Sequence, residues 1–154
     1  MPKLTFISVG TTKNSHFKAL EEDYFKRLSH YTEVTQLIVS DSKKTNQNQK
    51  IAEESSAISQ KIPSGSFIIL LDIMGKTLST EELANKINHW NNTSVNKLTL
   101  IVGGAYGVSE DLKKMANLKL SLSPMTFPHE LARVLLVEQM YRAHTILKGE
   151  KYHH

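Results

Sequence analysis

Three segments of this chain follow stretches that are typical of buried strands and carry residues suited to a ligand site. They are Leu71-Asp72-Ile73-Met74-Gly75, Val102-Gly103-Gly104 and the run from Leu120 to His129. In a parallel sheet, ligands bind outside the carboxyl ends of the strands, and glycine lets backbone groups approach a ligand closely. We therefore expect the three segments to form one pocket; the alternative is three ordinary turns between strands and helices.

Several other chemistries are excluded because required residues are missing. The chain has no cysteine, which excludes disulfides, thiolate zinc sites, iron–sulfur clusters and cysteine nucleophiles. Gly75-Lys76-Thr77 is similar to the end of a phosphate-binding loop, but Leu70 stands where the earlier glycine is needed. The segment from Gly103 to Gly107 is not G-x-G-x-x-G, and Ser123 stands about twenty positions on, where a dinucleotide fold needs an acidic residue. The histidines show no metal-ligand spacing, so we expect no metal.

Composition indicates a single domain over residues 1–154. The chain is 40 % hydrophobic, and its 19 Lys+Arg against 15 Asp+Glu give a net charge of +4. This modest positive charge permits an anionic partner such as RNA but does not require one. No run of about 18 apolar residues occurs, and the start lacks the pattern of a secretory signal, so we expect a cytoplasmic protein without membrane contact.

Strand-length apolar runs alternate with helix-period segments, which predicts an α/β fold with a mostly parallel sheet flanked by helices. The predicted strands are Lys3–Val9, Glu33–Val39, Phe67–Leu71, Leu98–Val102 and Leu118–Leu122. The predicted helices run from Asn14 or Ser15 to about His30, from Ile51 to before Pro63, from Ser79 to about Trp90, from Ser109 over a short stretch, and from Pro128 to about Leu147. The polar and basic segment from Asp41 to Lys50 is predicted to be a mobile loop.

The last predicted helix is unusually apolar. From Leu131 to Leu147, eleven of seventeen residues are apolar, and no single helix face holds them all. Such a helix must be covered on more than one side. A second copy of the chain is an economical cover; the alternative is a central helix buried within the monomer.

Several motifs of the chain resemble, in order and spacing, the RlmH family of SPOUT-class methyltransferases, which act on N3 of a pseudouridine in large-subunit (23S) ribosomal RNA. The likeness covers essentially the full length. The motifs are Val9-Gly10, Tyr24-x-x-Arg27-Leu28, Leu71-Asp72-Ile73-x-Gly75-Lys76, Ile101 to Gly107, Leu120 to His129, Arg133 to Ala143, and the terminal Tyr152-His153.

This resemblance implies a SPOUT fold with a C-terminal trefoil knot, S-adenosyl-L-methionine as cofactor, and a homodimer. The cofactor residues that it implies are Leu71, Gly103, Gly104, Leu122, Ser123, Pro124, Met125, Thr126 and Phe127. It also implies that the C-terminal tail of one chain places Tyr152 and His153 near the cofactor held by the other chain.

The chemistry of the implied reaction assigns hypothetical roles to these residues. Methyl transfer to N3 requires alignment of the nucleophile and loss of the N3 proton, and His153 is the candidate proton acceptor because histidine titrates near neutral pH. Arg142 or Arg133 can bind a phosphate or a uracil carbonyl, with Glu138 orienting Arg142; a structural ion pair is the alternative for each arginine. His129 either serves the cofactor loop or caps a helix.

The expected substrate is 23S rRNA within the assembled ribosome. A chain without an added RNA-binding domain has few phosphate contacts, so recognition by ribosome shape is expected. Lys13 and the lysines from Lys43 to Lys50 are candidate phosphate contacts, or else residues of a solvated surface. Two other functions stay open: a SPOUT methyltransferase with another RNA target, and a ribosome-binding protein that has lost catalysis.

Overall fold

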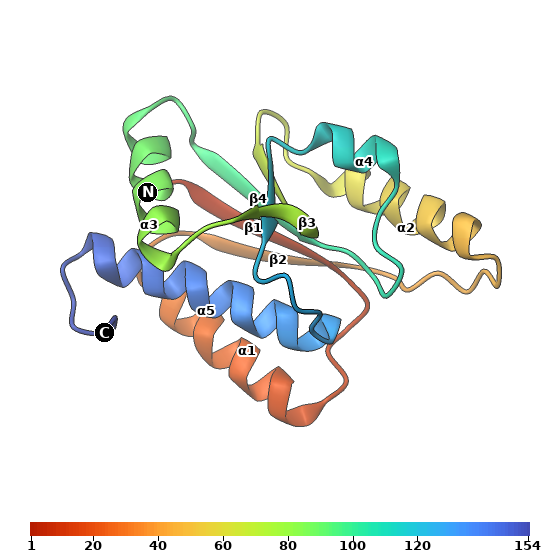
Figure 1. Ribbon diagram of the computed structural model, residues 1–154, viewed down its shortest axis with the longest axis horizontal. Coiled ribbons are helices and arrows are strands. Elements are labelled where there is room, and N and C mark those ends of the chain that lie inside the picture. Colours follow the sequence, from red (N-terminus) through yellow and green to blue (C-terminus); the bar gives the residue numbers. More distant parts are fainter.

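Five strands form one parallel sheet in the computed structural model, which describes residues 1–154 (Figure 1). The strands lie in the order β2 (Val34–Val39), β1 (Lys3–Val9), β4 (Lys97–Val102), β3 (Phe67–Thr77) and β5 (Leu118–Ser121). Every pairing between neighbours is parallel. The predicted class, an α/β fold with a parallel sheet, is therefore confirmed.

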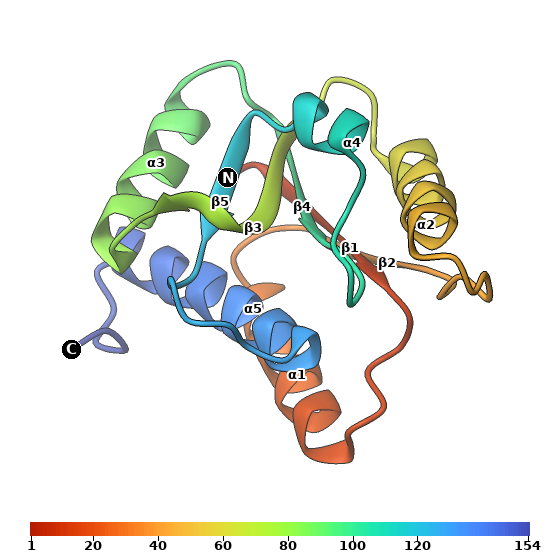
Figure 2. The same ribbon diagram turned by 45° about the vertical axis from the view of Figure 1, so that its right-hand side comes forward.

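Helices cover both faces of this sheet (Figure 2). On one face lie α1 (Ser15–Leu28), α3 (Thr80–Asn92) and α5 (His129–Leu147), and on the other lie α2 (Gln47–Lys61) and α4 (Glu110–Met115). Each helix-bearing face has its own apolar core, and the strands between them contribute to both. This explains why the strand segments read as nearly continuous apolar runs.

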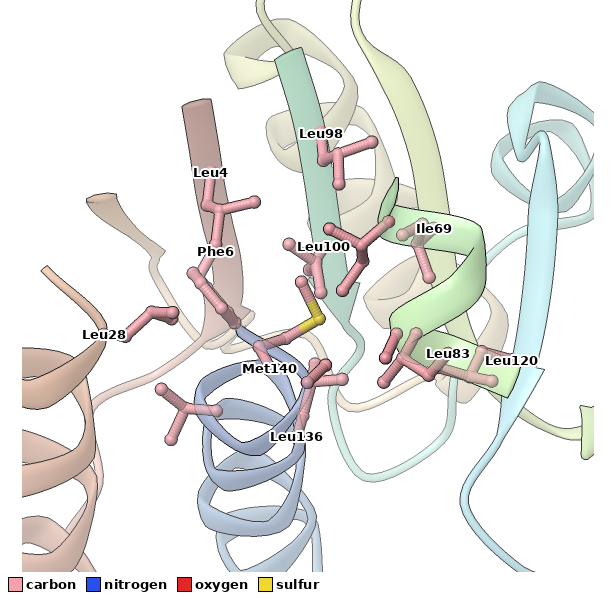
Figure 3. Close-up of a cluster of buried hydrophobic side chains, with 14 of the residues drawn as sticks. Leu4, Phe6, Leu28, Ile69, Leu83, Leu98, Leu100, Leu120, Leu136 and Met140 are labelled. Atoms are coloured by element: carbon pink, nitrogen blue, oxygen red, sulfur yellow. The ribbon is translucent and has the colours of Figure 1, made fainter. Parts of the chain in front are cut away.

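Alternate side chains of β1, β3 and β4 enter the two cores. In β1, Leu4 and Phe6 pack toward α1 and α5, whereas Ile7 and Val9 pack toward α2 and α4. Figure 3 shows the larger cluster, in which side chains from the sheet meet those of α1, α3 and α5. The side chains labelled there are Leu4, Phe6, Leu28, Ile69, Leu83, Leu98, Leu100, Leu120, Leu136 and Met140.

Local capping interactions start the helices where the sequence predicts. The Asn14 side chain accepts hydrogen bonds from the amides of His16 and Phe17 at the start of α1. Before α3, Ser79 and Glu82 form a complete capping box. These caps use only neighbouring residues, so the sequence alone is enough to locate them.

The predicted mobile loop from Asp41 to Lys50 is wrong in its second half. Asn46 caps α2, whose first turn begins at Gln47 and includes Lys50. The Lys50 ammonium lies 3.0 Å from the Asp41 carboxylate and donates to the Ser42 carbonyl at 2.7 Å. Lys50 is therefore tied to its own chain and is not a free phosphate contact.

Strand β3 is longer than predicted because it continues past an irregularity. Its pairing with β5 shifts register between Leu71 and Lys76, so that Lys76 pairs with Leu120 after the interruption. A side chain at Gly75 would put its Cβ atom 2.6 Å from the carbonyl carbon and oxygen of Lys119, so only glycine fits there. The segment Asp72–Gly75 is therefore not paired with β5, and it lies at the edge of the sheet where the ligand site was expected.

Most of α5 is covered within the monomer. The helix lies against α1, α3 and the sheet, and nine of its residues are buried. The apolar composition is therefore explained by the alternative of a central helix, and it does not by itself require a second copy. Leu131 and Leu135 belong to neither hydrophobic cluster and remain half-buried on the outer face of the helix.

Candidate functional site

The three segments singled out from the sequence come together in one pocket of about 490 Å³. It opens beside the bulge of β3 and beyond the ends of β4 and β5, and it is lined by residues of that bulge, of the loop after β4, and of the loop that joins β5 to α5. Ten of its nineteen lining residues are hydrophobic. Its volume lies within the range of about 300–1,000 Å³ that is common for small-molecule sites.

Eight of the nine cofactor residues implied by the resemblance line this pocket. They are Leu71, Gly103, Gly104, Leu122, Ser123, Met125, Thr126 and Phe127. Pro124 does not line it and is exposed in the turn of the same loop. His129 also lines the pocket. No side-chain hydrogen bond caps the start of α5, so His129 lies with the cofactor loop and does not act as a helix cap.

The sequence did not single out two charged residues of the pocket for this role, Asp72 and Lys113. Asp72 enters through the β3 bulge, where its carboxylate accepts a hydrogen bond from the Met74 amide at 2.9 Å. Lys113 reaches the pocket from the short helix α4. Asp72 lies in a segment that the sequence singled out, but not as a cofactor residue. The orientation of α4 is set by contacts between distant segments, so no local sequence signal identified Lys113.

The loop after β4 is fixed from behind by two buried residues of α2. A Cβ atom at Gly104 would lie 2.7 Å from the Glu54 carboxylate oxygen, so the loop passes against this side chain only because residue 104 is glycine. Glu54 accepts a hydrogen bond from the Ser42 amide, and burial raises its pKa. The adjacent Ser55 accepts a hydrogen bond from the Ser109 amide at 2.8 Å. Helix α2 therefore packs against the loop at Gly104 and is hydrogen-bonded to it at Ser109.

The loop after β5 is held by its own serines. The Ser121 hydroxyl donates to the Ser123 carbonyl at 3.0 Å, and the Ser123 hydroxyl accepts from the Met125 amide at 3.0 Å. The Met125 side chain is 74 % exposed at the mouth of the pocket. The loop thus presents apolar side chains and backbone groups, which can enclose an aromatic ring and bind its polar edge.

Arg142, Tyr152 and His153 form a second cluster, at the C-terminal end of α5. The Glu138 carboxylate accepts from the Arg142 guanidinium at 2.6 Å and from the Tyr152 hydroxyl at 3.0 Å. The guanidinium carbon of Arg142 lies 4.6 Å from the centre of the Tyr152 ring. His153 Nδ1 lies 3.4 Å from Arg142, and its Nε2 lies 2.8 Å from the Glu81 carboxylate. The structure therefore brings the three expected catalytic residues together.

The surroundings of this cluster set the protonation of its members. The hydrogen bond to Glu138 is the largest cause that raises the pKa of Arg142, so the guanidinium stays charged. Burial, followed by hydrogen bonds to Tyr24 and Glu138, raises the pKa of the Tyr152 hydroxyl well above its usual range. Tyr152 is therefore a hydrogen-bond donor at neutral pH and cannot serve as a base.

The hypothesis that Arg133 binds a phosphate or a uracil carbonyl is wrong for this structure. Its side chain is only 3 % exposed and donates to the backbone carbonyls of Val9 and Gly10 and to the Thr12 hydroxyl. Burial lowers the pKa of its guanidinium. Arg133 fixes the end of β1, and its partners are neutral oxygens instead of the expected carboxylate.

The two clusters lie at opposite ends of α5. Between His129 in the pocket and Arg142 in the tail cluster, the helix rises by about 20 Å. The catalytic candidates of one chain therefore do not reach the pocket of the same chain in this arrangement. No group of three His, Asp or Glu side chains is placed to hold a metal ion, and none of the helices has the length and apolar character needed to cross a bilayer.

The pocket lies where parallel α/β domains bind small molecules, which places this protein among the ligand-binding α/β folds. A family model described as "Predicted SPOUT methyltransferase" matches residues 2–153. Two relatives carry the name "Ribosomal RNA large subunit methyltransferase H". One, from Desulfotalea psychrophila, is 39 % identical over 98 % of this chain and 99 % of its own length. The other, from Clostridium botulinum, is 41 % identical over 97 % and 98 %. The chain belongs to the SPOUT methyltransferases and, within them, to the family of these large-subunit enzymes.

A solved structure shares the fold. It is described as a putative methyltransferase from Legionella pneumophila in complex with the bound cofactor SAM. It is 14 % identical to this chain, with a TM-score of 0.50, and the match covers 92 % of this chain and 66 % of that one.

Proposed function

We propose that this protein uses S-adenosyl-L-methionine to methylate N3 of a pseudouridine in 23S rRNA. The observation that carries the proposal is the pocket, whose nineteen lining residues include eight of the nine that the family resemblance implies for the cofactor. The relatives named as large-subunit rRNA methyltransferases match over nearly the whole of both chains, which supports the same class of substrate.

The residues of the pocket fit this cofactor. Apolar side chains such as Leu71, Leu122 and Phe127 can enclose the adenine ring, and the loop backbone at Gly103 and Gly104 can bind its polar edge. When bound, the cofactor supplies a methyl group that its sulfonium makes electrophilic. The protein needs to exclude water and align the nucleophile.

The active chain is proposed to be a homodimer, with each pocket completed by the partner's tail cluster. Leu135 lies midway between His129 and Arg142 on α5, and Leu131 and Leu135 are the half-buried apolar residues of this helix outside both cores. An antiparallel pairing of two α5 helices around Leu135 would place Arg142 of each chain at His129 of the other. This arrangement spans the distance that separates the two clusters in one chain.

Within such a site, His153 takes the N3 proton, and Arg142 holds a uracil carbonyl or a phosphate. Tyr152 acts as a donor and stacks on Arg142. Lys13, Lys43 and Lys44 remain candidate contacts to ribosomal RNA, since no ion pair occupies them. We also propose that the chain is a single domain with a C-terminal trefoil knot. It is proposed to act in the cytoplasm, on the assembled ribosome.

Transfer of a labelled methyl group to ribosomes that lack the modification tests this function. We expect label on N3 of one pseudouridine of 23S rRNA. Label on a ribose or on another base would instead favour a SPOUT methyltransferase with a different target. Calorimetric binding of S-adenosylmethionine without any transfer would favour a ribosome-binding protein that has lost catalysis.

A further inference from the structure

We propose that Glu81 is a positioning residue for methyl transfer, because its carboxylate fixes which nitrogen of His153 is free to take the substrate proton. The inference rests on the proposed role of His153 as proton acceptor. Glu81 was not among the residues that the motifs singled out, since it lies on α3, far from the tail in sequence.

The contact between Glu81 and His153 is direct and comes from a fixed backbone. Glu81 Oε1 lies 2.8 Å from His153 Nε2. Glu81 sits in the first turn of α3, whose start is fixed by the capping box of Ser79 and Glu82. In Figure 1, the C-terminal tail and α3 lie at the same end of α5. Because the start of α3 is fixed, the Glu81 side chain can hold His153, and with it the short C-terminal tail, in one orientation.

The pairing determines the protonation pattern of the imidazole. The hydrogen bond to His153 is the largest cause that lowers the pKa of Glu81, so its carboxylate is ionised at neutral pH and can only accept. Nε2 must therefore carry the hydrogen, which leaves the lone pair of the neutral ring on Nδ1. The charged groups facing the ring are Glu81 from α3 and Arg142 from α5, and Arg142 is itself paired with Glu138. No carboxylate contacts Nδ1.

Nδ1 thus carries no hydrogen and faces the Arg142 guanidinium at 3.4 Å, which can only donate to it. Nδ1 receives the substrate proton once Arg142 turns to its own proposed partner, a uracil carbonyl or a phosphate. In the transfer step, N3 forms a bond to the methyl carbon, and the bond from that carbon to sulfur breaks and leaves its electron pair on sulfur. The N3 proton goes to Nδ1 of His153, and the resulting imidazolium lies against the Glu81 carboxylate. A carboxylate on the far nitrogen of a catalytic histidine has the same orienting and stabilising effect in hydrolytic triads. Glu81 acts only through His153 and touches no reacting atom.

Three variants of the full-length protein test this assignment. Glu81→Gln removes the charge but keeps the shape, Glu81→Asp restores the charge on a shorter side chain, and Glu53→Gln removes another exposed charge, on the far face of the sheet. We expect Glu81→Gln to lower kcat about tenfold or more, with KM for the ribosome and affinity for S-adenosylmethionine changed less than about twofold. Glu81→Asp should recover part of the loss, and Glu53→Gln should match the wild type.

A double-mutant cycle shows whether Glu81 acts through His153. In the His153→Ala background, Glu81→Gln should cause no further loss of kcat. The assignment is overturned if Glu81→Gln behaves as Glu53→Gln does, if it raises KM without lowering kcat, or if its full effect persists without His153. Failure of the wild-type protein to methylate rRNA is a different result, because it would overturn the proposed function itself.

Discussion

His153 is the residue of the tail cluster that is suited to accept a proton. Tyr152 is held as a phenol by burial and by its hydrogen bonds, and Arg142 is held as a cation by Glu138. In His153, Nε2 is hydrogen-bonded to the Glu81 carboxylate, whereas Nδ1 makes only a long contact of 3.4 Å to Arg142. A proton acceptor needs a nitrogen that an incoming donor can reach, and only His153 offers one.

The first prediction compares the two tail residues. His153→Ala should lower kcat about a hundredfold while S-adenosylmethionine affinity stays nearly constant, because proton transfer is lost and the pocket is untouched. Tyr152→Phe keeps the ring beside Arg142 and loses one hydrogen bond, so its loss of kcat should be much smaller. Single-turnover rates and calorimetry measure the two quantities. Equal losses of rate and affinity in His153→Ala would exclude the proton-transfer role.

His144 provides the second prediction, which concerns stability. This side chain is fully buried in α5, with Nδ1 2.6 Å from the Met140 carbonyl and Nε2 without a partner. Burial lowers its pKa, so the folded protein keeps the ring neutral. The unfolded chain takes up the proton at a pH near about 6.5. The stability from neutral His144 is therefore present above that pH and decreases as pH falls below it.

Urea unfolding at pH 7, 6 and 5 measures this effect. The wild-type free energy of unfolding should fall across the series. His144→Asn keeps a donor for the Met140 carbonyl but cannot titrate, so the decrease that His144 causes should disappear, although the variant is less stable at pH 7. The same decrease in both proteins would show that other groups cause the pH dependence.

At the scale of elements, the cofactor loop depends on α2, which belongs to the opposite helix layer from α5. Glu54 and Ser55 are consecutive and both are buried; Glu54 packs against Gly104, and Ser55 accepts a hydrogen bond from the Ser109 amide. The third prediction is that Gly104→Ala weakens S-adenosylmethionine binding about tenfold, because its Cβ atom displaces the loop from Glu54. Gly65→Ala is the control: its φ of +74° makes it costly to folding, but it lies outside the pocket. Calorimetry should show altered affinity in Gly104→Ala only.

The elements also show how far the sequence alone could lead. The helix starts at Asn14 and Ser79 were predictable because a cap uses residues within the same turn. The three pocket segments were predictable because a parallel sheet gathers its strand ends at one edge. The β3 bulge, the partners of Arg133 and the contact between Glu81 and His153 depend on segments brought together by folding. No local pattern encodes such contacts, so only the structure reveals them.

For the whole molecule, the central question is how two clusters at opposite ends of α5 can serve one reaction. The helix separates His129 from Arg142 by about 20 Å, and both clusters are anchored to neighbouring helices or loops. A rearrangement within one chain would have to break the Glu138 and Glu81 contacts of the tail. A two-fold pairing along α5 breaks none of them, which is why the homodimer is the favoured arrangement.

The fourth prediction tests the shared site by mixing two inactive proteins. His153→Ala chains keep an intact pocket, and chains with a bulky Gly104→Leu substitution keep an intact tail. In a mixed dimer, one of the two sites combines the intact pocket with the intact tail. If dimers re-form at random, about half are mixed, and methyl transfer should recover to about a quarter of the wild-type rate. Size-exclusion chromatography with light scattering confirms that the dimers re-form. If each chain instead completed its own site, mixing would restore no activity, since every chain would still carry its own defect.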